Sequence, residues 1–175
     1  APWINQTLGA LQGKAAETSQ LTMRYGINTG DWLVQPILHN EDILIASGQG
    51  HYKERLLDRP FRIASPSFFQ VNTKQAERLA ELVRERLDLI GTELVVDAHA
   101  GVGTFAVLLA PFVRKVVAIE ESSAALKDAA INTLGIENLD FIEGRTEDVL
   151  DELAGDTDAV VLDPPRTGCH PEALQ

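Results

Sequence analysis

The residues that could do chemistry gather in two short segments, each directly after an apolar run. Asp-Pro-Pro-Arg at 163–166 follows the run 159–162, which predicts a strand that delivers the carboxylate of Asp163 into a rigid loop. Earlier in the chain, Asp-Ala-His-Ala-Gly-Val-Gly-Thr-Phe at 97–105 follows the run 94–96. In open α/β sheets, ligands bind at the carboxyl ends of the strands. The two segments therefore predict a cofactor cleft formed by two strand ends.

The glycine loop by itself leaves the cofactor open. Gly101, Gly103 and Ala106 fit the pattern G-x-G-x-x-G/A, in which glycines let the backbone approach a ligand at a helix N-terminus. Glu120 ends the next apolar run, where a carboxylate suits the two hydroxyls of a ribose. Nicotinamide dinucleotides and S-adenosylmethionine both fit this pattern, and glycines that only permit tight strand–helix packing produce it too.

Two features favour S-adenosylmethionine. Asp97 precedes Gly101 in the arrangement D-x-x-x-G-x-G, which is typical of methyltransferases. Asp163 should face the same cleft, because the first and fourth strands adjoin in a doubly wound sheet. Methyl transfer to a planar nitrogen or carbon needs polar groups fixed beside the reacting atom, whereas a dehydrogenase has no evident need for this element.

The elements that must position these residues alternate between strand and helix, which predicts a parallel α/β sheet. A helix with an Asn72–Gln75 capping box ends at Gly91. The pattern then predicts strands at 94–97, 116–120, 139–142 and 159–162, and helices at 104–113, 123–134 and 146–153. The first 65 residues are expected to be β-rich and irregular, with strands at 31–38 and 42–47.

Composition and charge divide the chain near residue 65. The chain has 175 residues, 45% hydrophobic and 23% charged, which is typical of a soluble globular protein. No apolar run or leader pattern predicts a membrane span or secretion, and one cysteine excludes a four-cysteine metal or iron–sulfur site, so we expect a cytoplasmic protein without a metal. Residues 1–65 sum to zero charge, and residues 66–175 carry the whole net charge of −11. An acidic segment does not suit a polyanion, so if RNA is bound, the first segment or a part of the protein outside this sequence should supply most of the electrostatic attraction.

One family resemblance emerges from these motifs. The string Ser-Pro-Ser-Phe-Phe-Gln-Val-Asn at 65–72, the glycine loop and Asp-Pro-Pro-Arg-x-Gly at 163–168 resemble the S-adenosylmethionine-dependent RNA 5-methyluridine (uracil-C5) methyltransferase family. The resemblance covers about residues 45–175. It implies a Rossmann-like class I methyltransferase domain at 66–175, truncated at its C-terminus, preceded at 1–65 by part of a smaller β-rich domain that faces RNA.

The resemblance also implies a cofactor, a partner and a set of site residues. The cofactor would be S-adenosyl-L-methionine, and the partner would be tRNA or rRNA. The cofactor-binding residues would be Gln70, Asp97, His99, Gly101, Gly103, Thr104, Glu120 and Asp163.

The sequence departs from that family in two ways. The family loop usually has an aromatic residue where His99 stands and a cysteine where Ala100 stands, so weaker stacking on the cofactor is expected. The family nucleophile is a cysteine in an S-C-N-P segment, which we expect beyond Gln175, so the fragment alone should be inactive. Cys169 and His170 are interpreted as loop residues rather than as nucleophile and base.

Alternative interpretations remain open at this point. An N-methyltransferase of adenine or glutamine would carry an aromatic residue where Arg166 stands, and a non-catalytic adaptor would use the same fold for binding only. Phe68 and Phe69 could stack on a flipped base or fill the core. Arg166 and the strip from His51 to Arg62 could contact RNA or be solvated.

Overall fold

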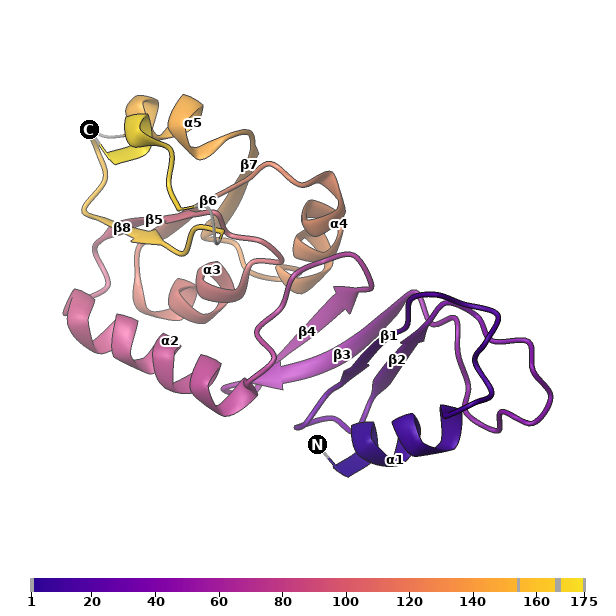
Figure 1. Cartoon of the computed structure of the whole chain (residues 1–175). Coiled ribbons are helices and arrows are strands. Elements are labelled where there is room, and N and C mark those ends of the chain that lie inside the picture. The colour runs from indigo at the N-terminus through magenta and orange to yellow at the C-terminus, as the bar shows by residue number, and fades with distance from the viewer. Residues whose placement is uncertain (1, 154, 166–167, 175) are drawn as a thin grey trace. The chain divides into compact units, whose positions relative to one another are not determined.

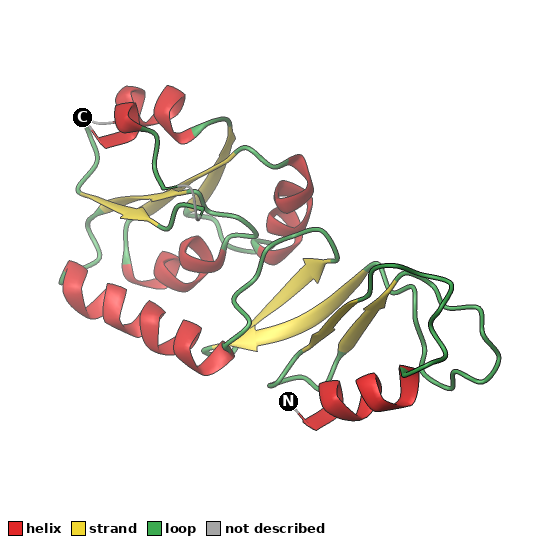
Figure 2. Cartoon of the chain, viewed as in Figure 1, coloured by secondary structure: helices red, strands yellow, loops and turns green. Residues whose placement is uncertain are grey.

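The computed structural model describes residues 2–153, 155–165 and 168–174 and divides the chain into two compact units, Ala1–Pro66 and Ser67–Gln175. Figure 1 labels the elements, and Figure 2 shows that most of the helices belong to the second unit. Among the described residues, no helix is long and apolar enough to cross a membrane.

In its described residues, the first unit contains one helix and two antiparallel hairpins. Its elements are α1 (Pro2–Leu11), β1 (Thr22–Tyr25), β2 (Trp32–Gln35), β3 (His51–Leu56) and β4 (Arg59–Ala64). β1 pairs with β2 and β3 pairs with β4. Its core holds Leu33, Leu56, Phe61 and Ile63, all at most 1% exposed.

Two expectations for this unit are wrong, and one predicted strand is longer than the observed one. Residues 42–47 form no strand: no strand of the described residues pairs with this run, and Leu44 within it is 96% exposed. The helix α1 was not expected in a segment assigned to β structure. The strand expected at 31–38 is shortened to Trp32–Gln35, because Pro36 has no N–H to donate to a ladder.

The second unit is a parallel sheet with helices on both faces, as the alternating pattern predicts. Its elements are α2 (Thr73–Leu87), β5 (Leu94–Ala98), α3 (Thr104–Leu109), η1 (Ala110–Phe112), β6 (Lys115–Glu120), α4 (Ser123–Asn132), β7 (Leu139–Glu143), α5 (Thr146–Leu153), β8 (Ala159–Leu162) and η2 (Pro171–Leu174). The strand order is β7-β6-β5-β8, and every pair is parallel. The predicted contact between the first and fourth strands of this sheet is confirmed.

Successive side chains of β5 point to opposite faces of the sheet. Val96 and Ala98 belong to a cluster with Val117 and Ile119, and apolar side chains of α5 pack against that cluster. Asp97 lies on the other face, where its side chain meets the first turn of α3. α5 and α3 accordingly lie on opposite sides of the sheet in Figure 1.

Three helix ends differ from the sequence prediction. Asn72 caps α2 as expected, since its Oδ1 accepts from Gln75 N at 3.3 Å, but the helix ends at Leu87 rather than at Gly91. Asp88 already adopts a left-handed conformation there, with φ 49°. α3 stops at Leu109 and tightens into η1, where Pro111 follows. α4 ends at Asn132, two residues earlier than expected.

Candidate functional site

The carboxyl ends of β5, β6 and β8 lie level with one another. The register pairs Ala98 with Ile119 of β6 and with Leu162 of β8, so the loop after β5, Glu120 and Asp163 all leave the sheet at the same edge. This is the edge where ligands of open α/β sheets bind.

The segment before α2 reaches that edge as well. Ser67 is buried and its Oγ donates to the buried carboxylate of Asp128 in α4 at 2.7 Å, which anchors the start of the segment. Three residues later, Gln70 Nε2 donates to Asp163 Oδ2 at 3.4 Å. The hydrogen bond joins the Phe-Phe-Gln-Val-Asn string to the Asp-Pro-Pro segment across 93 residues of sequence.

The two phenylalanines of this string have different environments. Phe69 is 4% exposed and fills the core, whereas Phe68 is 73% exposed. The core alternative is therefore confirmed for Phe69 alone, while Phe68 is exposed and its stacking on a base stays a hypothesis.

The glycine loop is held by Glu120. Gly101 N donates to Glu120 Oε2 and Ser122 N donates to Oε1, each at 2.7 Å. Gly101 and Gly103 have φ values of 59° and 87°, a region that glycine enters at little cost. Each carboxylate oxygen of Glu120 keeps a further lone pair, so the side chain can orient the loop and still accept from a ligand hydroxyl.

Asp97 lies behind the loop and has no solvent exposure. Its Oδ2 accepts from Ala106 N in α3 at 2.8 Å, and its Oδ1 has no partner among the described residues. The pKa of Asp97 is raised to about 7: burial is the main cause, the hydrogen bond from Ala106 opposes it, and the nearby charges of Asp163 and Glu120 add to it. Because the side chain is enclosed, its action on a ligand at the loop surface would be electrostatic.

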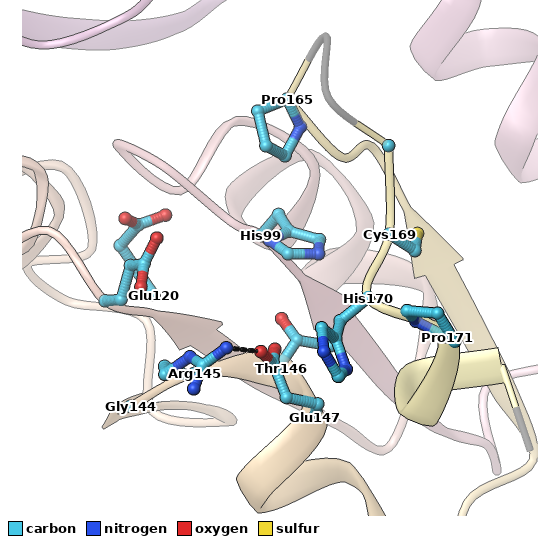
Figure 3. Close-up of a pocket in the computed structure, with 12 residues that line it drawn as sticks. His99, Glu120, Gly144, Arg145, Thr146, Glu147, Pro165, Cys169, His170 and Pro171 are labelled. Carbon is cyan, nitrogen blue, oxygen red and sulfur yellow. Dashed lines mark hydrogen bonds and ion pairs between the residues drawn. The ribbon is translucent and has the colours of Figure 1, made fainter.

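A cavity of about 400 Å³ lies beside this loop (Figure 3). That volume is within the range of small-molecule sites. His99 and Glu120 are the expected site residues in its wall, while Gln70, Asp97, Gly101, Gly103, Thr104 and Asp163 are not among its lining residues. Thr104 is the first residue of α3, and Gly103 is its N-cap.

Most of the cavity wall was missed by sequence reasoning. Glu121 and the segments after β7 and after β8 supply the rest of the wall. These segments contribute Gly144, Arg145, Thr146, Glu147, Pro165, Gly168, Cys169, His170 and Pro171. The strand-end rule could have indicated residues 144–147, because they directly follow β7. Cys169 and His170 were interpreted as loop residues, and they do lie in a loop, but that loop lines the cavity.

His99 is drawn in the middle of the lining residues in Figure 3. Its φ is 65°, and its Nε2 is buried without a partner among the described residues. The ring lines the cavity, but this nitrogen is enclosed, so a ligand there would meet other atoms of the imidazole. Arg166 lies outside the described residues, and among the residues that are described no group of three or more His, Cys, Asp or Glu could hold a metal ion.

Comparisons with known proteins give this geometry a context. The chain is 40% identical over 150 residues to an uncharacterized RNA methyltransferase of Synechocystis sp., across 81% of this chain and 32% of that protein. It is 34% identical over 171 residues to an uncharacterized RNA methyltransferase of Porphyromonas gingivalis, across 94% of this chain and 36% of that protein. The chain thus spans about a third of the length of these curated relatives. No protein-family model matches it.

Solved structures agree on the fold. The tRNA (uracil-54, C5)-methyltransferase of Pyrococcus abyssi, in complex with S-adenosyl-L-homocysteine, superposes with a TM-score of 0.70 at 25% identity, over 88% of this chain and 45% of that one. The fold is that of a class I methyltransferase. TYW2 of M. jannaschii, in complex with AdoMet, shares this fold at 22% identity and a TM-score of 0.54, over 79% of this chain and 57% of that one.

Proposed function

We propose that the chain binds S-adenosyl-L-methionine and forms the cofactor-binding part of an RNA methyltransferase that acts on C5 of uracil. In this proposal residues 66–175 are the cofactor domain, and residues 1–65 belong to a domain that faces RNA. The RNA methyltransferase relatives support the activity class, and the Pyrococcus abyssi enzyme supports the uracil-C5 specificity.

The observation that carries the cofactor assignment is the acidic environment of the strand ends. Asp163 and Glu120 lie close enough to Asp97 for their charges to raise its pKa. Such a cluster favours a cationic ligand, and S-adenosylmethionine carries a sulfonium and an ammonium group. A dinucleotide carries an anionic pyrophosphate, which these carboxylates would repel.

The proposed roles follow from the contacts of each residue. Glu120 would accept from the ribose hydroxyls while it holds Gly101, and His99 would pack on the cofactor from the cavity wall. Asp163, oriented by Gln70, would lie beside the transferable methyl group. Gly101, Gly103 and Thr104 would let the loop and the start of α3 approach the cofactor closely, and Asp97 would stabilise positive charge from behind.

Isothermal titration calorimetry tests the cofactor assignment directly. The chain should bind S-adenosyl-L-homocysteine and S-adenosyl-L-methionine and give no heat with NAD. Binding of NAD with no response to either methionine derivative would overturn the proposal.

The target atom needs a separate test. Cellular RNA from a strain with the gene disrupted should lose 5-methyluridine, measured by mass spectrometry of its nucleosides. A strain that keeps its 5-methyluridine and instead loses a methylated adenosine would show that the enzyme modifies a nitrogen, and no change in any methylated nucleoside would favour the adaptor.

A further inference from the structure

The β3–β4 hairpin of the first unit has one apolar and one basic face. Burial alternates strictly along β3, where His51, Lys53 and Arg55 are exposed and the residues between them are buried. The antiparallel register places Arg62 directly opposite Lys53 and Pro60 opposite Arg55. Because directly opposed residues share a face, Arg62 lies on the same face as Lys53 and Arg55. We call these three residues and His51 the basic face.

The two acidic residues of the hairpin itself, Glu54 and Asp58, do not occupy this face. Glu54 is 2% exposed on the opposite side, where its carboxylate accepts from Ile27 N at 2.7 Å and Asn28 N at 3.0 Å. Asp58 lies in the turn between the strands, and Asp31 accepts from the backbone N–H of Lys53. The first unit has no net charge, yet four of its six basic residues are in this hairpin. The positive charge of the first unit is therefore concentrated in this hairpin, although it is balanced by acidic residues over the unit as a whole.

We propose that the basic face binds the phosphate backbone of the substrate RNA, an inference that rests on the proposed RNA methyltransferase function. Lys53 and Arg55 stand about 6.8 Å apart along the strand, so they present a row of cations to a strand of phosphates. Contacts of this kind position a nucleic acid without reading its sequence. The acidic second unit, with a net charge of −11, is poorly suited to this task.

The salt dependence of RNA binding tests the proposal. The Lys53→Gln/Arg55→Gln double variant changes two exposed side chains and should leave the fold intact. A matched control, Lys74→Gln/Lys127→Gln, removes the same charge from two exposed positions of the second unit. The probe is an unmodified transfer-RNA transcript labelled at its 5′ end, followed by fluorescence anisotropy from about 25 to 200 mM KCl, the range in which phosphate contacts dominate affinity.

The hairpin variant should lose about 1.4 to 1.8 from the slope of log affinity against log salt, since each lost phosphate contact removes about 0.7 to 0.9. The control should keep the slope of the unmodified chain. Equal slopes in the chain and the hairpin variant, equal losses in both variants, or no RNA binding at the lowest salt would each overturn the inference. If the basic face instead binds the acidic unit of a second copy, the chain should self-associate and only the hairpin variant should lose this self-association. That result would also overturn the inference.

Calorimetry with S-adenosyl-L-homocysteine separates this inference from the function on which it rests. Both variants should bind that ligand like the unmodified chain. Cofactor binding without a hairpin effect on RNA would refute the basic face alone, whereas a chain that binds no methionine derivative would refute the proposed function.

Discussion

Replacing Asp97 with asparagine should stabilise the protein at neutral and higher pH. The side chain is fully buried, and its pKa is raised from 3.8 to about 7, first by burial and then by the charges of Asp163 and Glu120. Asparagine keeps a carbonyl oxygen that can accept from Ala106 N, so the hydrogen bond to α3 can survive. The substitution thus removes the titration with little change in shape.

The sign follows from proton linkage. Between pH 3.8 and about 7 the folded protein holds a proton on Asp97 that the unfolded chain has released, so stability falls as the pH rises through this range. Each pH unit corresponds to about 1.4 kcal/mol. Between pH 5 and pH 8 the unmodified chain should therefore lose about 3 kcal/mol relative to the Asp97→Asn variant.

Urea denaturation at several pH values measures this difference. The control is Asp151→Asn, which removes a carboxylate that is exposed to solvent on α5. A free-energy difference between chain and Asp97→Asn variant that stays constant from pH 5 to pH 8 would show that Asp97 does not titrate in this range. The reasoning about its enclosure would then be wrong.

Three further predictions concern the loop, the hairpin turn and the cofactor. Glu120→Ala should weaken S-adenosyl-L-homocysteine binding by about 1–3 kcal/mol in calorimetry, because a charged hydrogen-bond acceptor is lost. The Leu57→Asn/Asp58→Gly double variant should stabilise the protein by about 1 kcal/mol in urea denaturation, because Asn-Gly accepts the two positive φ values readily. Gly103→Ala should destabilise it by about 1–3 kcal/mol, because φ is 87° and the new Cβ would stand 3.2 Å from Phe141 Cζ.

Controls for these predictions come from neighbouring positions. Glu137→Ala, at an exposed site outside the loop, should leave ligand affinity unchanged. Gly101→Ala shares the positive φ, at 59°, but its Cβ would meet nothing within 4 Å, so it should cost less stability than Gly103→Ala. Equal costs at the two glycines would mean that the contact with Phe141 contributes nothing.

The sequence determined the architecture of the second unit. The bounds of α5 and β8 agree with the prediction residue for residue, because each apolar or periodic run there is bordered by glycine, proline or charged residues. The pairing of β5 with β8 also followed from the alternation of strand and helix, which permits few topologies. These properties depend on local patterns, so a single sequence carries them.

Only tertiary contacts decided the structure of the first unit. The run 42–47 has the sequence of a strand, but no strand in the described part of the chain pairs with it. In contrast, β3 forms although it includes Glu54, a buried charged residue of a type that is rarely found in a core. Glu54 is tolerated because the backbone N–H groups of Ile27 and Asn28, in a distant loop, satisfy its carboxylate. The sequence of β3 alone could not predict those donors, because they belong to another segment.

The candidate site shows the same division. The glycine loop, Glu120 and Asp163 were evident from the sequence because a strand ends at each of them. The cavity wall at 144–147 and 168–171 was not, because β7 and β8 lie on opposite edges of the sheet and only the folded chain brings their following loops to His99. Residue types and spacing thus determined which chemistry was available, while the order of strands in space decided which side chains enclose the ligand.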